Sequence, residues 1–185
     1  MPFRRGPPGV LDTPDGWHLG VVGENETQLP VAPLTTAITS REYPVAGTFT
    51  GKITGGGKTK LAGGSMEAGE QIGCGIISDE TEINPGFTFA PNIGISAAGV
   101  PGPFQTGGTD PFLQGKVYLK PGTVTTVAID KKSFKGTSTR ITITGVRIKT
   151  DQCAGQSFVR SYATLTSSTD NTDDVITYLG VTKSV

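Results

Sequence analysis

The residues of this sequence that could carry out catalysis are few. His18 is the only histidine, so a Ser-His-Asp or Cys-His site would have to be built on it. No nucleophile motif, such as the Gly-x-Ser-x-Gly turn of hydrolases, lies near His18. We therefore expect His18 to be an exposed or packed side chain. The sequence does not support an enzyme.

The stretch GGGKTK, residues 55–60, invites comparison with a phosphate-binding P-loop. The complete motif requires a glycine five residues before its Gly-Lys-Thr, and Lys52 occupies that position here. No helix is predicted after the stretch to direct backbone N–H groups at a phosphate. We expect a glycine-rich turn instead.

Three carboxylates, Asp79, Glu80 and Glu82, lie close together in the sequence. Such a group could supply catalytic carboxylates or metal ligands. No second acidic set with a matching spacing appears, and a solvated strand face is the preferred explanation. The sequence therefore predicts neither a metal nor a cofactor.

The two cysteines, Cys74 in IGCGI and Cys153 in DQCAG, have a spacing that fits no zinc or redox motif. They are either two buried free thiols or a disulfide that ties two strands together. Export of the protein would favour the disulfide. The sequence leaves both open.

The composition is typical of an all-β protein with many turns. Hydrophobic residues make up 35% and charged residues 17%, with 27 glycines and 13 prolines. Thr and Ser are abundant, whereas the residues that favour helices are scarce. The net charge is zero and the pI is about 6.6, so a nucleic-acid partner is not expected.

The order of the strand-like segments suggests a sandwich with an excursion. Residues 1–16 are predicted to be a loose, flexible lead, followed by short strands at residues 19–22 and 29–34 that the polar GENE separates. Further short strands follow, and no segment shows a helical period. We predict that residues 17–73 and 122–185 share one β-sandwich, which the hairpin at 74–121 leaves.

The hairpin contains a long ribbon with period two, INPGFTFAPNIGISAAG, residues 83–99. One parity is apolar and the other small or polar, so one side of the ribbon must face a core, another subunit or lipid. Pro85 and Pro91 argue against a central strand, and against a regular barrel strand too. No apolar run is long enough for a transmembrane helix, whereas a barrel strand needs only about 9–11 residues. One hairpin cannot close a barrel, but several copies could.

Several segments resemble the MspA-type porins of the mycobacterial and nocardial outer membrane. They are SREYPVAGTFTG, GGSMEAGEQIGCGI, APNIGIS and the C-terminal VRIKTDQCAGQSFVRSYATLTSSTDNTDDVITYLGVTKSV. EAGEQIG is similar to the family's ELGYQIG step into the stem, and the nocardial and rhodococcal branch is the most similar. The resemblance covers roughly residues 11–185.

The resemblance implies a goblet-shaped homo-oligomer, octameric in the best-known member, whose sandwiches form the rim and whose hairpins form one transmembrane β-barrel stem. It implies passive diffusion of ions and small hydrophilic solutes through a water-filled channel. The partners would be copies of this chain, or a related porin chain as in some nocardial relatives, together with the lipids of the mycolate outer membrane. The N-terminal MPFRRGPPGV lacks the apolar stretch of a signal peptide, which fits an exported, mature chain.

Site residues follow from the ribbon and the resemblance together. The lumen-facing candidates of the stem are Glu80, Glu82, Asn84, Thr88, Lys116 and Lys120. The lipid-facing candidates are Ile83, Phe87, Phe89, Ile93, Val117 and Leu119. The candidates for the pore constriction are Asn92, Ser96, Ala97, Ala98 and Asp110.

The constriction departs from the family pattern. The best-known porin carries aspartates just after its Pro-Asn-Ile, whereas residues 94–99 contain no carboxylate here. Asp110 is the only acidic candidate in the loop, and otherwise small neutral groups line the throat. With Glu80 and Glu82 opposed by Lys116 and Lys120, we expect at most a weak preference for cations. A soluble oligomeric surface-binding sandwich and a secreted pore-forming toxin are the alternative functions.

Overall fold

The computed structural model describes residues 5–32, 39–75, 80–84, 115–117, 124–151, 153 and 155–185. All regular elements in this part of the chain are β-strands, and all strand pairs are antiparallel. None of the described residues forms a helix with the length and apolar character needed to cross a membrane. The expectation of an all-β sandwich is confirmed.

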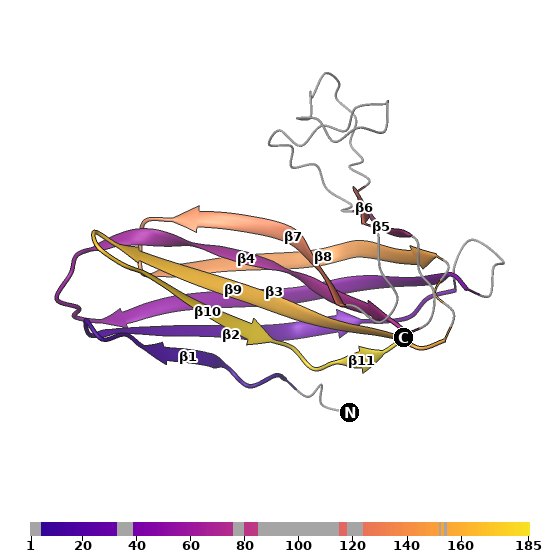
Figure 1. Cartoon of the computed structure of the whole chain (residues 1–185), viewed down its shortest axis with the longest axis horizontal. Coiled ribbons are helices and arrows are strands. Elements are labelled where there is room, and N and C mark those ends of the chain that lie inside the picture. The colour runs from indigo at the N-terminus through magenta and orange to yellow at the C-terminus, as the bar shows by residue number, and fades with distance from the viewer. Residues whose placement is uncertain are drawn as a thin grey trace, which may run out of the picture.

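The strands form two stacked sheets whose strands run along the long axis of the molecule (Figure 1). Sheet A has the order β1 (Gly9–Asp12), β2 (Trp17–Gln28), β3 (Arg41–Gly55), β8 (Ser138–Asp151), β5 (Glu80–Asn84) and β6 (Gly115–Val117). Sheet B has the order β10 (Asp173–Leu179), β9 (Ser157–Thr169), β4 (Leu61–Cys74) and β7 (Val124–Phe134), and β11 (Lys183–Ser184) pairs with β9.

Alternate residues of both sheets form one core. Sheet A contributes Leu19, Val21, Tyr43, Val45, Phe49, Ile53, Ile141, Ile143, Val146 and Ile148, and sheet B contributes Met66, Ala68, Ile72, Val127, Val159, Ala163, Leu165 and Tyr178. The Phe49 and Tyr178 rings contact each other between the sheets, with centroids 6.3 Å apart. Burying each large side chain contributes roughly 1.5–3 kcal/mol, so this core is the main source of stability.

A bulge in β8 explains why its buried residues change from odd to even positions along the strand. Ile141 and Ile143 are buried at odd positions, whereas Val146 and Ile148 are buried at even ones. Gly145 lies between the two pairs with φ +69°, and the register with β3 shifts at this point. Glycine adopts this backbone conformation without steric cost, so both halves of β8 present their apolar residues to the core.

The N-terminal region differs from the sequence prediction in two ways. Gly9–Asp12, predicted to belong to the loose lead, form strand β1 because their backbone pairs with β2 and Leu11 packs against the core. Residues 17–28 form one continuous strand through GENE. Asn25, with φ +54°, lies in a bulge there, and beyond it Glu26 is buried. Of residues 29–34, the described ones form only an isolated bridge at Val31.

The two ends of the sandwich are distinct. We call the end at Cys74, Val124 and Ser157 the hairpin end, because β5 and β6 join sheet A beside Asp151 there. The opposite, far end carries the turns at residues 13–16, 135–137 and 170–172. The GGGKTK stretch is also at the far end and connects β3 to β4 as a turn.

Candidate functional site: the root of the hairpin

The described part of the hairpin is its root, where two short strands join the edge of sheet A (Figure 1). β5 pairs with β8, and β6 pairs with β5, both antiparallel. Glu82 is the Cα partner of Lys116, and Ile83 is the partner of Gly115. The chain thus leaves the sandwich along β8 and returns beside its own outgoing strand.

A row of alternating charges crosses the root. Glu42 of β3, Lys149 of β8, Glu82 of β5 and Lys116 of β6 are successive Cα partners. Residues that are Cα partners in an antiparallel ladder lie on the same face of the sheet. A register shifted by a single residue would exchange the two faces of the root strands.

The sandwich side of this row is bound by ion pairs and hydrogen bonds. Arg147 Nε lies 2.8 Å from the buried Glu42 Oε1. Lys149 Nζ lies 2.9 Å from Asp151 Oδ2, and the Ser40 hydroxyl donates to Asp151 Oδ1 at 2.6 Å. These contacts fix the end of β8 to which the hairpin is attached.

The odd-numbered residues of β5 and β6 stand in the same rows as buried residues of β8. Ile83 is the Cα partner of Ile148, and Thr81 is the partner of Thr150 and of Val117. Ile148 and Thr150 are both fully buried in the sandwich. Ile83 and Val117, which are predicted to face lipid, thus occupy register positions in the same rows as these buried residues.

A disulfide joins Cys74 and Cys153. Cys74 ends β4 in sheet B, and Cys153 follows β8 in sheet A, so the bond ties the two sheets together where the chain enters and leaves the root. Backbone bonds from Cys153 N to Thr39 O and from Gly75 N to Gln156 O surround it. The sequence left the state of these cysteines open, and the structure joins them.

A polar cluster is buried between the sheets in the half toward the hairpin end. Gln28 Nε2 donates to both carboxylate oxygens of Glu70, at 3.1 and 2.9 Å. The hydroxyls of Ser161 and Tyr178 donate to the two oxygens of Glu26, at 2.7 and 3.1 Å. All five side chains belong to buried residues, so every carboxylate oxygen is compensated by a hydrogen bond inside the core.

Glu70 has a strongly perturbed acidity. Burial raises the pKa of the Glu70 carboxyl to about 8, the hydrogen bond from Gln28 acts in the opposite direction, and the charge of Glu26 raises it further. Lys183 has a lowering effect. The cause is desolvation, which disfavours the charged form of a carboxyl.

The burial of Glu70 could have been predicted from the sequence. Glu70 has the same parity as Met66, Ala68 and Ile72, the core residues of β4. Strict alternation therefore places this glutamate inside. Glu26 could not be found in this way, because the bulge at Asn25 changes the phase of β2.

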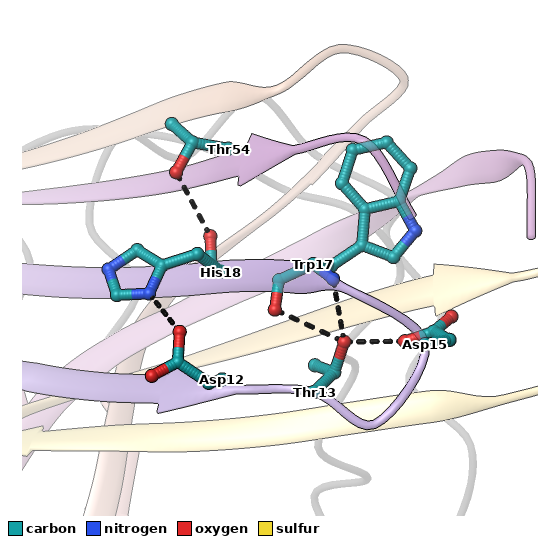
Figure 2. Close-up of polar contacts among 6 residues, drawn as sticks. All are labelled: Asp12, Thr13, Asp15, Trp17, His18 and Thr54. Atoms are coloured by element: carbon teal, nitrogen blue, oxygen red, sulfur yellow. Dashed lines mark hydrogen bonds and ion pairs between the residues drawn. The ribbon is translucent and has the colours of Figure 1, made fainter. Parts of the chain in front are cut away.

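The single histidine forms a surface pair. Figure 2 shows the His18 ring facing Asp12, with Nδ1 2.5 Å from Oδ1, and both side chains are largely exposed. The Thr13 hydroxyl nearby accepts a bond from Trp17 N and shapes the turn between β1 and β2. In the part of the chain that the structure describes, no serine or cysteine contacts the His18 ring and no cluster of three metal-ligating side chains occurs.

The structure describes few of the residues that are predicted to line the pore. Phe87, Thr88, Phe89, Asn92, Ile93, Ser96, Ala97, Ala98, Asp110, Leu119 and Lys120 lie outside the described residues. Glu82 and Lys116 lie in the described root strands at the register positions given above, and there Glu80 is the Cα partner of Asp151 and Asn84 the partner of Arg147.

The chain matches one family model, described as MspA, over residues 15–184. A search among curated proteins found no match. The matched region includes both sheets of the sandwich except β1, and both root strands.

Proposed function

Because this chain belongs to the MspA family, a family of porins, we propose that it forms a water-filled channel in the mycolate outer membrane of an actinobacterium. Identical chains assemble into an octameric ring, and ions and small hydrophilic solutes diffuse through it passively. The proposal needs no catalytic group and no cofactor.

The observation that carries the proposal is the antiparallel root, which leaves residues 85–114 between β5 and β6. A single hairpin in lipid would leave backbone groups unpaired at both edges, at several kcal/mol each. Hairpins from neighbouring chains remove these edges by closing a shared barrel. The period-two pattern of residues 83–95 supplies one polar and one apolar face for such a barrel.

The two faces of the stem follow from the register at the root. The even parity, with Glu80, Glu82, Asn84 and Thr88, faces the lumen, and Lys116 and Lys120 join it from the returning strand. Beyond the root, the odd parity, with Phe87, Phe89 and Ile93, faces lipid. At the root itself, that parity is continuous with the core face of sheet A.

The wall of the vestibule above the stem is then the outer face of sheet A, because it continues the even parity of β5. This face carries threonines that are at least partly exposed at positions 48, 50, 54, 142 and 144. Hydroxyl groups hydrate well without a net charge, which suits a passage for small polar solutes of either sign.

The throat is built from small neutral side chains. Asn92, Ser96, Ala97 and Ala98 follow the polar parity or the loop at its end, and Asp110 is the acidic candidate on the returning segment. The negative charges of Glu80 and Glu82 are opposed by the positive charges of Lys116 and Lys120, so the electrostatic potential in the lumen is close to zero. Cation preference is therefore weak.

The proposal is tested by adding the purified, detergent-extracted chain to a planar lipid bilayer in salt solution. We expect long-lived conductance steps of uniform size, and a reversal potential in a salt gradient that shows a slight cation preference. The control variant replaces residues 86–113 with a short Gly-Ser linker, which keeps the sandwich and the root strands. Conductance from this variant, or none from the folded wild-type oligomer, would contradict the proposal.

A further inference from the structure

The sandwich has two lateral sides, each formed by one free edge of each sheet. On one side lie β7 and the part of β8 before Val146, and on the other lie β10 and β1. No described residue pairs with the outer backbone edge of β7 or of β1. Long unpaired edges invite pairing with another chain unless they are protected.

The two sides carry opposite charge at the far end of the sandwich. The β7 side has exposed Lys131, Lys132 and Lys135, with Asp130 as the only acidic residue between 124 and 137. The β10 side has Asp170, Asp173 and Asp174, joined by Asp12 and Asp15 near β1. At the far end, the basic residues close to the β10 side are Lys58 and Lys60, in the turn that bonds to Asp15, whereas Arg5 and Lys183 lie on this side nearer the hairpin end.

None of the three lysines and none of Asp170, Asp173 and Asp174 makes an ion pair within the described part of the chain. Glu67, the register partner of Lys131, accepts its hydrogen bond from the Tyr162 hydroxyl instead. The charges of both sides are therefore available to a partner.

The lysines of the β7 side and the aspartates of the β10 side also lie at similar positions along the strand direction. Phe134, Gly64, Ser167 and Asp174 form one continuous row of Cα partners across sheet B, from one free edge to the other. Lys135 and Asp173 are each one residue beyond this row toward the far end. Lys131 and Lys132 are two to three residues inside it, a distance of about 7–10 Å at the rise of a strand.

The edge strands also carry exposed apolar side chains, of which Val175 lies beside the aspartates and Val124 and Leu179 lie toward the hairpin end. Of the large hydrophobic residues with exposed side chains, four lie on the edge strands: Val124 (65% exposed) on β7, Val175 (57%) and Leu179 (36%) on β10, and Val10 (61%) on β1. Charged groups at the rim and apolar groups beside them are the usual composition of a protein interface.

We propose that the β7 side of one chain docks on the β10 side of the next, with the three lysines facing Asp170, Asp173 and Asp174 of a second copy. The proposal rests on the ring of the proposed function and assigns its contact surfaces. Copies related by rotation about the pore axis keep the direction of their strands. Since β7 and β10 run in opposite directions, they meet antiparallel, and so do β8 and β1.

The test uses two variants of opposite sign, K131E/K132E and D173K/D174K, and measures oligomer mass by native mass spectrometry in detergent. Each variant alone places like charges on both sides of every contact, so we expect each to lose the ring at a concentration where the wild type is fully assembled. Lys52→Glu, an exposed change on the face of sheet A, is the control and should assemble as the wild type does.

Mixing the two variants decides the question. In a mixture, the acidic β7 side of the first variant meets the basic β10 side of the second, and the reverse contact is also complementary. We expect the ring to return with strict alternation of the two chains, and therefore with an even number of subunits. The chain that carries all four changes should assemble by itself.

If K131E/K132E and D173K/D174K each assembled at the wild-type level, the proposal would be overturned. The lysines would then serve only to protect the free edge of β7 from unwanted pairing. Loss of the ring without rescue by mixing would also overturn it, provided that circular dichroism shows both variants folded. A wild-type chain that forms no ring would instead contradict the proposed function, so the two failures are distinguishable.

Discussion

At the scale of single residues, Glu70 is a buried carboxyl whose protonation is coupled to folding. It is buried between the sheets, and its pKa is raised to about 8 in the folded chain from an ordinary value of 4.5. Between these two values the folded state binds a proton that the unfolded state has released. The free energy of unfolding therefore falls as the pH rises through this window, and the loss is complete above the folded pKa.

We predict that the melting temperature of the wild type decreases between roughly pH 5 and pH 8, and that Glu70→Gln removes most of this decrease. The glutamine keeps the size of the side chain and an oxygen that can accept from Gln28. Glu67→Gln on the same strand is the matched control and should keep the decrease. Equal slopes for the wild type and Glu70→Gln would contradict the assignment.

Residue types and parity predicted the core well but could not locate the changes of phase. The odd positions of β3 from Tyr43 to Ile53 and the even positions of β4 from Met66 to Cys74 are buried, as alternation requires. Asn25 and Gly145 adopt positive φ values, each adding one residue to its strand. Such bulges depend on the register with the neighbouring strand, which no single segment of sequence contains. Burial of Glu26 follows directly from the first of them.

At the scale of elements, the disulfide and the pairing of β5 with β8 hold the hairpin root in place. Cys74 and Cys153 are 79 residues apart, and the loop between them contains the whole hairpin. Closing a loop of this length in the unfolded chain removes conformational entropy worth about 4 kcal/mol. The bond also keeps the ends of β4 and β8 together, from which the two root strands are positioned.

We predict that Cys74→Ser/Cys153→Ser lowers the free energy of unfolding by about 2–4 kcal/mol, measured by denaturant titration of the detergent-extracted chain. A reductant should bring the wild type to the same midpoint and should leave the double variant unchanged. A wild-type midpoint that ignores the reductant would show that the bond does not carry this stability.

The existence of the hairpin could be predicted from its sequence, but its attachment could not. Alternation from residue 83 to 95 and the Gly- and Pro-rich loop after it suffice to propose two strands and a turn. That β5 pairs with β8, and that Ile83 stands in the row of the buried Ile148, depends on contacts between distant segments. For this reason, parity alone could not give the register positions of Ile83 and Val117 at the root.

At the scale of the whole molecule, the sandwich, the root and the two charged sides are together suited to a ring of identical chains. The outer face of sheet A continues the polar parity of the root, and the lateral sides are free to contact neighbours. A ring of such chains would place the hairpins side by side around one axis. The pore then belongs to the assembly, and no single chain contains it.

The most direct test of this account is chemical modification of single channels in a bilayer. Thr88→Cys and Phe87→Cys are neighbours of opposite parity, and the native cysteines are already joined in a disulfide. We predict that a positively charged, water-soluble methanethiosulfonate reagent lowers the conductance of Thr88→Cys channels in discrete steps and leaves Phe87→Cys channels unchanged. Equal sensitivity at both positions, or sensitivity at Phe87→Cys alone, would contradict a lumen lined by the even parity of the hairpin.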